Sequence, residues 1–233
     1  MNLNDLFNGK ELDPIEAIKF AITEFSSSIT IASSFSAEDM VVIDMAVKED
    51  RSVSIFTLDT GRLPEETYEL MDKVEKIYGI KILKFFPDAT ALERLENNKG
   101  MYSFRKSVAN RIECCGIRKV EPLKRALEGK KAWLTGLRRA QSFSRGSVKQ
   151  FDIDQVNGGI IKINPLINWN NKMVWEYIKV RNLPYNALYD KGFVSIGCVP
   201  CTRPISKGED DRAGRWWWEE NTTKECGLHF KDI

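Results

Sequence analysis

The sequence predicts a mixed α/β fold, in which a parallel, twisted sheet is flanked by helices and followed by an irregular C-terminal tail rich in cysteine and tryptophan. Short β-prone runs alternate with stretches of helical periodicity over residues 14–134, which is typical of βαβ units. The chain has 233 residues, of which 42% are hydrophobic, enough to bury a core. After about residue 150 the alternation weakens, which favours a less regular ending.

The first helix begins at Asp13-Pro14, because aspartate caps a helix N-terminus and proline fits the first turn. The β-prone runs cover residues 29–32, 52–58, 80–86 and 132–134. Further helices are expected over residues 40–47, 64–78, 116–128 and 170–182. Gly79 and Gly129 end two of these helices, since glycine tolerates the left-handed conformation of a helix end.

Ligands of parallel α/β sheets bind beyond the carboxyl ends of the strands. Three segments are expected there: residues 33–39, 59–63 and 136–145. The first offers Ser33, Ser34 and a helix N-terminus, whose free N–H groups suit a phosphate. The third offers Arg138, Arg139 and Arg145. Helix capping explains the serines when they are taken alone, but three arginines at the same edge favour an anionic nucleotide.

The net charge of +2 hides an asymmetry along the chain. Residues 99–149 contain fourteen Lys and Arg against three Glu, a local excess of eleven positive charges. Such a segment fits a polyanion or a phosphorylated ligand, and a solvated basic face is the alternative. The sequence shows no secretory signal and no apolar run of the roughly 18 to 20 residues that a membrane span needs. We therefore expect a cytoplasmic protein without a membrane partner.

Cysteine is the most informative residue type, because five cysteines in a reducing compartment indicate metal or thiol chemistry rather than disulfides. Cys114-Cys115 is an adjacent pair just before a predicted helix, and Cys198 and Cys201 form a CxxC. Four thiolates suit a zinc ion or a [4Fe–4S] cluster, and the adjacent pair slightly favours the cluster. Buried, inert cysteines are the alternative.

Cys226 stands apart from these four, in a segment with Lys224 and His229, the chain's one histidine. A single histidine excludes His-rich zinc sites and disfavours a Ser-His-Asp centre. A thiol beside a lysine can have a lowered pKa and act as a nucleophile, whereas an inert surface cysteine is the alternative. The preceding Trp216-Trp217-Trp218 is expected to pack the root of the tail or to form a partner surface.

Seven segments, in this order, give the sequence a specific resemblance. They are Ala37-Glu38-Asp39, Leu58-Asp59-Thr60-Gly61-Arg62, Cys114-Cys115-Gly116-Ile117-Arg118-Lys119, Gly136-Leu137-Arg138-Arg139, Gly197-Cys198-Val199-Pro200-Cys201-Thr202-Arg203-Pro204, Gly214-Arg215-Trp216-Trp217-Trp218-Glu219-Glu220 and Lys224-Glu225-Cys226-Gly227-Leu228-His229. Over nearly its whole length the chain resembles the thioredoxin-dependent assimilatory adenylyl-sulfate (APS) reductases, relatives of the phosphoadenylyl-sulfate (PAPS) reductases.

The resemblance implies a fold like that of adenine-nucleotide α-hydrolases and a role in sulfate assimilation and cysteine biosynthesis. The substrate would be adenosine 5′-phosphosulfate and the products sulfite and AMP. Cys226 would attack the sulfur and carry an S-sulfocysteine intermediate, which thioredoxin would cleave. One [4Fe–4S] cluster would bind to the four remaining cysteines, Cys114, Cys115, Cys198 and Cys201. Residues 1–205 would form a single nucleotide-binding and iron–sulfur domain, and residues 206–233 the segment with the catalytic cysteine.

Further site residues are implied by position in the matching segments. Lys119 would lie between cluster and substrate, and Arg145, Arg212 and Arg215 near the phosphosulfate, with His229 at the tail. Thr60 and Gly61, together with Ser33, Ser34, Arg138 and Arg139, complete the substrate-binding set. One departure concerns the phosphate loop, where Ser36 stands at the expected glycine.

Two rivals stay open on the sequence alone. The first is a reductase of 3′-phosphoadenosine 5′-phosphosulfate or of both nucleotides, although such enzymes typically lack the four cluster cysteines. The second is a zinc-stapled nucleic-acid-binding module that uses the basic segment. Because no recognised nucleic-acid motif is present, we expect no nucleic-acid partner. The oligomeric state stays open, a homo-oligomer included.

Overall fold

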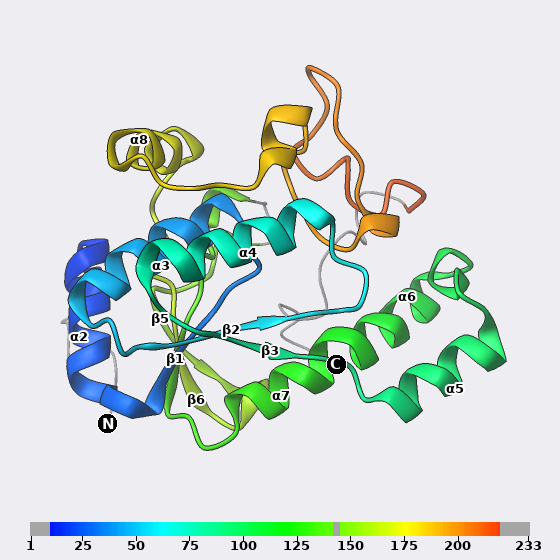
Figure 1. Cartoon of the computed structure of the whole chain (residues 1–233), viewed down its shortest axis with the longest axis horizontal. Coiled ribbons are helices and arrows are strands. Elements are labelled where there is room, and N and C mark those ends of the chain that lie inside the picture. The colour runs from blue at the N-terminus through cyan, green and yellow to red at the C-terminus, as the bar shows by residue number, and fades with distance from the viewer. Residues whose placement is uncertain (1–9, 142–144, 220–233) are drawn as a thin grey trace. The chain divides into compact units, whose positions relative to one another are not determined.

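The computed structural model describes residues 10–141 and 145–219 (Figure 1). The chain divides into two compact units, each built from several stretches of sequence. Unit 1 comprises the described parts of Met1–Phe56, Glu69–Leu83 and Gly129–Asn186. Unit 2 comprises the described parts of Thr57–Tyr68, Lys84–Glu128 and Ala187–Ile233. Among the described residues no helix is both long and apolar enough to cross a membrane.

A six-stranded sheet in the order β3-β2-β1-β4-β6-β5 is the central element of the fold. Its strands are β1 (Ile29–Ala32), β2 (Ser54–Leu58), β3 (Ile82–Phe85), β4 (Ala132–Leu134), β5 (Phe151–Asp154) and β6 (Ile160–Ile163). β1 pairs in parallel with both β2 and β4, and β4 pairs in parallel with β6. β5 runs antiparallel to β6. The predicted parallel α/β sheet is therefore confirmed.

The helices of unit 1 bury apolar faces, as the sequence pattern predicts. They are α2 (Pro14–Phe25), α3 (Ala37–Glu49) and α8 (Asn171–Arg181), together with most of α4 (Glu65–Tyr78). α2 and α8 both pack against α3, which is nearly all buried (Figure 1). Asp13 caps α2 with a capping box, and Pro14 is its first residue, as expected from the sequence.

Unit 2 is built mainly from helices that the sequence pattern did not all reveal. They are α5 (Ala89–Lys99), α6 (Val108–Cys115), a π-helix (Gly116–Val120), α7 (Glu121–Leu127) and the short 3₁₀ turns Ala187–Lys191 and Val199–Cys201. The predicted helix over residues 116–128 is confirmed as the π-helix and α7, but the sequence did not reveal that another helix, α6, ends at the cysteine pair. A five-residue π-helix follows the cysteine pair. π-helical turns are rare in proteins, but those that occur are often found at functional sites.

Four elements were missed: β5, β6, α5 and α6. The β5–β6 hairpin carries a readable signal, since Phe151-Asp152-Ile153-Asp154 alternates apolar and polar residues and an Asn-Gly-Gly turn leads into β6. α5 and α6 are short and amphipathic only in part, and Asp88 and Ser107 cap them locally. Such helices depend on tertiary packing, which periodicity does not reveal.

Candidate active site

The sheet edge of unit 1 brings two of the predicted segments together. β1 and β4 are parallel neighbours, with Ile31 opposite Leu134, so the loops that follow them start side by side. β1 is also the strand at which the order reverses, since β2 and β4 lie on its two sides. Such a switch point is where doubly wound sheets bind nucleotides. A Cβ atom on Gly136 would lie 2.8 Å from Glu38 Cβ, so only glycine allows this approach.

The loop after β1 is folded around the carboxylate of Asp39. The backbone N–H of Ser34 donates to Asp39 Oδ2 at 2.7 Å and the Ser34 hydroxyl at 2.8 Å. Ser36 caps α3, and its N–H also donates to this oxygen. Ser33 accepts from the N–H of Phe35, which has a φ of 60°. Burial raises the pKa of Asp39, and the Ser34 hydrogen bonds oppose this. Both predicted serines therefore organise the loop locally.

The three predicted arginines of unit 1 have carboxylate or amide partners. Arg138 donates from Nε to Glu38 Oε1 at 3.0 Å and from Nη2 to the same oxygen at 2.5 Å. Arg139 pairs with Glu11 and donates to the Val148 carbonyl at 2.8 Å. Arg145 donates to the Gln141 side chain, which in turn donates to Glu38 Oε1 at 3.0 Å. Glu38 thus anchors Arg138 directly and Arg145 through Gln141.

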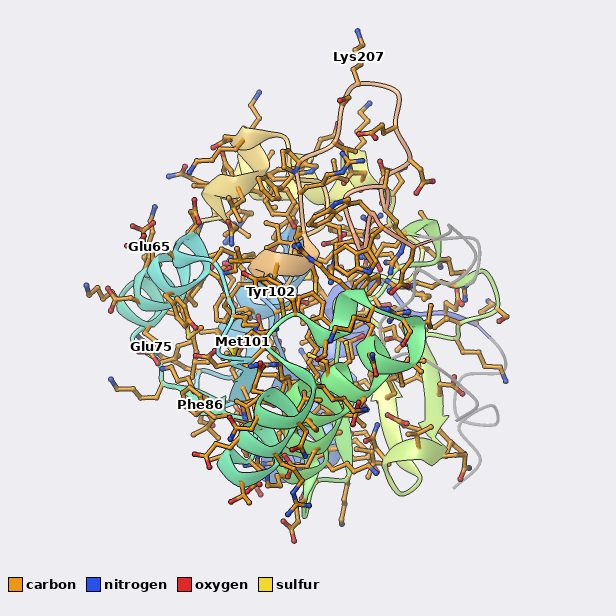
Figure 2. The ribbon with its side chains drawn as sticks, turned by 90° about the vertical axis from the view of Figure 1, so that its right-hand side faces the viewer. Glu65, Glu75, Phe86, Met101, Tyr102 and Lys207 are labelled. Carbon is orange, nitrogen blue, oxygen red and sulfur yellow. The ribbon has the colours of Figure 1, made fainter. Side chains whose placement is uncertain are left out.

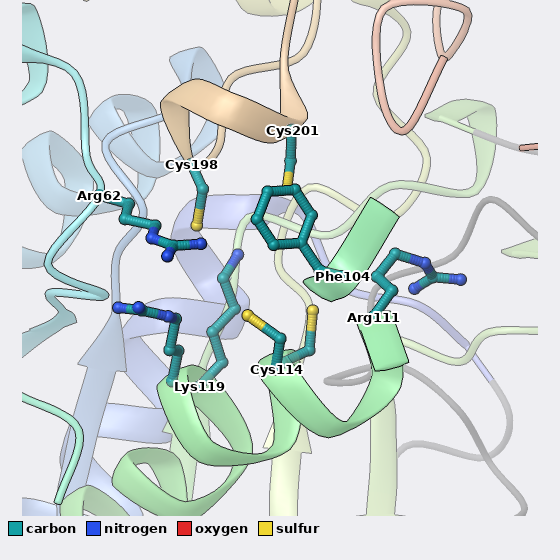
Figure 3. A pocket seen from close by; sticks show the side chains of 9 residues that line it. Arg62, Phe104, Arg111, Cys114, Lys119, Cys198 and Cys201 are labelled. Carbon is teal, nitrogen blue, oxygen red and sulfur yellow. The ribbon is translucent and has the colours of Figure 1, made fainter. Parts of the chain in front are cut away.

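In unit 2, the adjacent Cys114 and Cys115 and the CxxC cysteines Cys198 and Cys201 lie at one hollow of about 300 Å³, a volume that includes its open mouth. The hollow is lined by Arg62, Phe104, Arg111, Cys114, Cys115, Arg118, Lys119, Cys198 and Cys201 (Figure 3). Cys114 and Cys115 come from the end of α6, and Cys198 and Cys201 flank the 3₁₀ turn. Leu95, Phe104 and Cys114 form a buried apolar cluster, so the wall of the hollow at Phe104 and Cys114 is backed by apolar side chains.

Basic side chains surround these sulfurs. Figure 3 shows the ammonium end of Lys119 pointing toward the space between the cysteines, with Arg62 beside Cys198. Arg62 and Arg118 converge on Glu96 Oε1, at 2.7 and 2.5 Å. Arg118 also donates to the Thr60 carbonyl at 2.5 Å. One carboxylate therefore fixes two arginines at the cysteine hollow.

Thr60, a predicted substrate contact, lies against a cysteine. It is fully buried, and its hydroxyl forms a hydrogen bond of 3.2 Å with the sulfur of Cys198. The same hydroxyl accepts from the N–H of Arg62 at 3.2 Å. Gly61 follows in a left-handed turn with a φ of 69°, which the Asp59 carboxylate stabilises by accepting its N–H at 2.8 Å. Thr60 thus orients a potential ligand, as outer-shell hydrogen bonds do.

The thiols are held in an environment that disfavours free thiolates. Burial raises the pKa of Cys114, while Arg118 and Arg62 lower it. Burial, with Cys198 nearby, raises the pKa of Cys201 to about 12. Within the described ranges no three His, Cys, Asp or Glu side chains converge on a single ion. A set of four buried or half-buried thiols with basic side chains around them nevertheless suits a larger thiolate-bound group with negative charge. These cysteines could hold a cofactor.

Arg215 and Arg212 lie at the root of the C-terminal segment. Arg215 is buried and donates to Ser195 Oγ at 3.2 Å. Its guanidinium passes over Gly197, where any side chain would collide with it. Arg212 lies 5.9 Å from the ring of Trp216. Both arginines belong to unit 2 with the cysteine hollow. The predicted Cys226 and His229 lie outside the described residues.

Four residues that line the cysteine hollow were missed in the sequence: Arg62, Phe104, Arg111 and Arg118. Glu96, which pairs with two of them, was missed as well. Arg62 and Arg118 both stand inside segments that carry the resemblance, so their position was a usable signal. Glu96 gives no such signal, because it lies on the unpredicted helix α5.

Comparison with known proteins agrees with this geometry. Residues 28–204 match the family model described as "Phosphoadenosine phosphosulfate reductase domain". The chain is 46% identical over 229 residues to an adenosine 5′-phosphosulfate reductase of Allochromatium vinosum, covering 98% of this chain and 89% of the relative. A phosphoadenylyl-sulfate reductase of Candida auris, solved as a phosphate complex, is 30% identical with a TM-score of 0.73, covering 85% of this chain and 95% of the other. An FMN adenylyltransferase of Candida glabrata shares the fold alone, at 15% identity and a TM-score of 0.58, covering 91% of this chain and 76% of the other.

The sheet order and these structural neighbours define the chain as an α/β protein of the adenine-nucleotide α-hydrolase-like class, as predicted. Within that class, the chain belongs to the phosphoadenosine phosphosulfate reductase family. The prediction of an enzyme, an oxidoreductase that acts on sulfur, is thereby confirmed.

Proposed function

We propose that this chain reduces adenosine 5′-phosphosulfate to sulfite and AMP with thioredoxin as the electron donor, in cytoplasmic sulfate assimilation and cysteine biosynthesis. The observation that carries the proposal is the gathering of Cys114, Cys115, Cys198 and Cys201 at one basic hollow. The relatives named adenosine 5′-phosphosulfate reductase match almost the whole chain, which supports the same substrate here.

The proposed reaction transfers a sulfonate group to a thiolate of the chain. Cys226, on the segment 206–233, attacks the sulfur atom, so that an S–S bond forms and the S–O bond to the phosphate breaks. AMP leaves with the electron pair of the broken bond. A thioredoxin thiolate then attacks the Cys226 sulfur and releases sulfite. The second thioredoxin thiol resolves the mixed disulfide, so thioredoxin supplies the two electrons that take sulfate-level sulfur to sulfite.

This reaction requires positively charged side chains near the substrate. A thiolate attacks an anionic phosphosulfate, and negative charge builds up on the leaving phosphate. Lys119, at the cysteine hollow, and Arg212 and Arg215, at the root of the tail, are proposed to supply the positive charge. Ser33, Ser34 and Arg145 of the sheet edge, with Arg138 and Arg139 behind them, are proposed to hold the nucleotide. His229 is proposed to contact the substrate from the tail.

The four cysteines are proposed to bind one [4Fe–4S] cluster. The donor set fits it: four thiols from two segments meet at one hollow, and the Thr60 hydroxyl shares a hydrogen bond with one sulfur. The raised pKa values of Cys114 and Cys201 indicate that these buried thiolates need positive charge close by. When bound, the cluster would supply a fixed charge near the phosphosulfate and would not carry the electrons of the reaction.

A second candidate substrate is 3′-phosphoadenosine 5′-phosphosulfate. It is favoured by the structural similarity to a phosphoadenylyl-sulfate reductase that the chain matches over 95% of its length. The four cysteines favour the nucleotide without the 3′-phosphate. The nucleic-acid-binding module, by contrast, loses its support with the family assignment.

Sulfite release from each nucleotide, measured after anaerobic purification and with thioredoxin added, tests the proposal. We expect sulfite to be released from adenosine 5′-phosphosulfate. We also expect the purified protein to be brown, with a broad absorbance band at about 400 nm. The Cys226→Ser variant should keep nucleotide binding and colour but release no sulfite. Turnover near the wild-type rate in that variant would refute the assigned nucleophile. A coloured wild-type enzyme that releases no sulfite from either nucleotide would refute the function.

A further inference from the structure

Arg111 is one of the most deeply buried side chains of the described chain, although it carries a full charge. It is 1% exposed and lies on α6, one turn before Cys114 and Cys115. Its Nε donates to Glu219 Oε1 at 2.6 Å, and the side chains of the pair are 1% and 4% exposed. In Figure 3 its guanidinium lies to one side of the cysteine sulfurs. A buried arginine of this kind is held by its partners, since removing one of them leaves an uncompensated charge.

Trp216 is the second partner of Arg111. The guanidinium lies 4.6 Å from the centre of the Trp216 ring, and that of Arg215 lies 4.7 Å from it. Trp216 is 1% exposed and has a φ of 40°, a left-handed conformation that a bulky residue adopts only when its surroundings enforce it. We call Arg111, Arg215, Trp216 and Glu219 the Arg111 clamp.

The clamp joins both cysteine segments to the same short stretch of chain. Arg111 connects it to α6, which ends in Cys114-Cys115. The backbone N–H of Trp216 donates to the carbonyl of Cys201 at 3.2 Å. Glu219 closes a turn by donating its N–H to the Trp216 carbonyl at 2.8 Å. Residues 216–219 are therefore fixed to the cysteine hollow from two directions.

We propose that Arg111 is a positioning residue that fixes the root of the C-terminal segment to the cysteine-bearing helix, so that the segment with Cys226 starts from a defined point. This inference rests on the proposed function only in making Cys226 the nucleophile. Cys226 lies seven positions after Glu219 in the sequence. An extended chain of that length reaches at most about 25 Å from its fixed end. A fixed origin confines the thiol to that volume and raises its effective concentration at the substrate.

A role in stability alone predicts a different pattern from a role in positioning. If the clamp only stabilises the fold, its loss lowers stability and leaves the rate of sulfur transfer in the folded enzyme unchanged. If it positions the tail, its loss slows transfer while nucleotide affinity and cluster absorbance are kept.

The experiment compares Glu219→Gln with the control Glu113→Gln. Glu113 lies on α6 together with Arg111, and it pairs with Lys99 at 2.6 Å, the distance of the Arg111–Glu219 pair. The side chains of Glu113 and Lys99 are, however, 40% and 44% exposed. Tryptic cleavage after the buried Arg215, followed by mass spectrometry, reports release of the root. Single-turnover transfer of sulfur to Cys226 without thioredoxin reports positioning.

We expect Glu219→Gln to speed cleavage and to slow transfer, each by about tenfold or more, with nucleotide affinity within about threefold of wild type. Glu113→Gln should match wild type in all of these. Wild-type rates in Glu219→Gln, or equal changes in both variants, would overturn the proposal.

A double variant guards against misfolding of the single one. Arg111→Gln with Glu219→Gln buries no unpaired charge, and we expect it to fold and still to show faster cleavage and slower transfer than Glu113→Gln. A double variant indistinguishable from the control would overturn the proposal. The cleavage assay needs no turnover. A wild-type enzyme that releases no sulfite would therefore refute the proposed function, while the clamp is judged on cleavage.

Discussion

The ion pair between Glu38 and Arg138 offers a quantitative test of the sheet edge. Both side chains are nearly buried, at 9% and 6% exposure. Glu38 Oε1 accepts from Nε and Nη2 of Arg138, and from Nε2 of Gln141, at 3.0, 2.5 and 3.0 Å. Glu38→Ala removes all three bonds and leaves a buried guanidinium without its carboxylate. Breaking a buried pair in this way costs about 3–5 kcal/mol.

The isosteric Glu38→Gln substitution should lower the free energy of unfolding by less than Glu38→Ala, because glutamine keeps a hydrogen-bond acceptor and loses only the charge. Charged hydrogen bonds exceed neutral ones by about 1 kcal/mol each, which gives about 2 kcal/mol for the two bonds from Arg138. In a chain of 233 residues, about 2–4 °C of melting temperature corresponds to each kcal/mol. We expect losses of about 6–20 °C for Glu38→Ala and about 4–8 °C for Glu38→Gln.

Urea denaturation followed by circular dichroism gives the free energies of unfolding. Glu49→Gln is the matched control, because Glu49 is exposed at the end of the same helix and should change stability by less than about 0.5 kcal/mol. A loss below about 1 kcal/mol in Glu38→Ala would refute a buried, paired Glu38.

Three further predictions concern the loop after β1 and the cysteine hollow. Burial raises the pKa of Asp39 above its ordinary 3.8, so the free energy of unfolding should fall as the pH rises from that value through the raised pKa. Asp39→Asn, which cannot ionise, should remove this loss in urea denaturations between about pH 4 and pH 8. Glu96→Gln removes a negative charge beside the hollow and should raise the midpoint potential of the bound group by tens of millivolts in a redox titration, whereas the exposed Glu93→Gln on the same helix should not. An unchanged potential in Glu96→Gln would contradict the electrostatic role. With a thiol reagent, the loaded enzyme should show one fast thiol, Cys226, whereas the stripped enzyme should react at all five cysteines, slowly at Cys114 and Cys201 because burial raises their pKa; reaction of all five before stripping would exclude a bound cluster.

Local patterns were sufficient for most of the sheet and its first helices. The Asp13-Pro14 start of α2 was predicted because a capping box is a local signal. β1 and β4 were predicted within the bounds that the structure shows. β5 and β6 form an antiparallel pair that is not part of a βαβ unit, so the alternation of strands and helices did not reveal them. The helical nature of residues 108–115 depends on packing against the turn before it and on a cap at Ser107.

The cysteine site could be predicted because its chemistry lies in the side chains themselves. Four thiols in two short motifs were expected to meet, and the structure gathers them at one hollow. The role of Thr60 could not be predicted, because its hydroxyl bonds to a residue 138 positions away in the sequence. The segment with Cys226 and His229 stays a prediction, since it lies outside the described residues.

The basic segment shows why a charge count along the sequence overstates what is offered to a ligand. Several of its arginines pair with carboxylates distant in the sequence. Arg138 pairs with Glu38 across 100 positions and Arg111 with Glu219 across 108. These pairs fix elements to one another and leave less net positive charge than the excess of eleven indicates. Lys119 lines the cysteine hollow, and its ammonium points into it. The charge that serves catalysis is therefore set by where side chains point, and Lys119→Ala should slow sulfur transfer far more than it lowers cluster content.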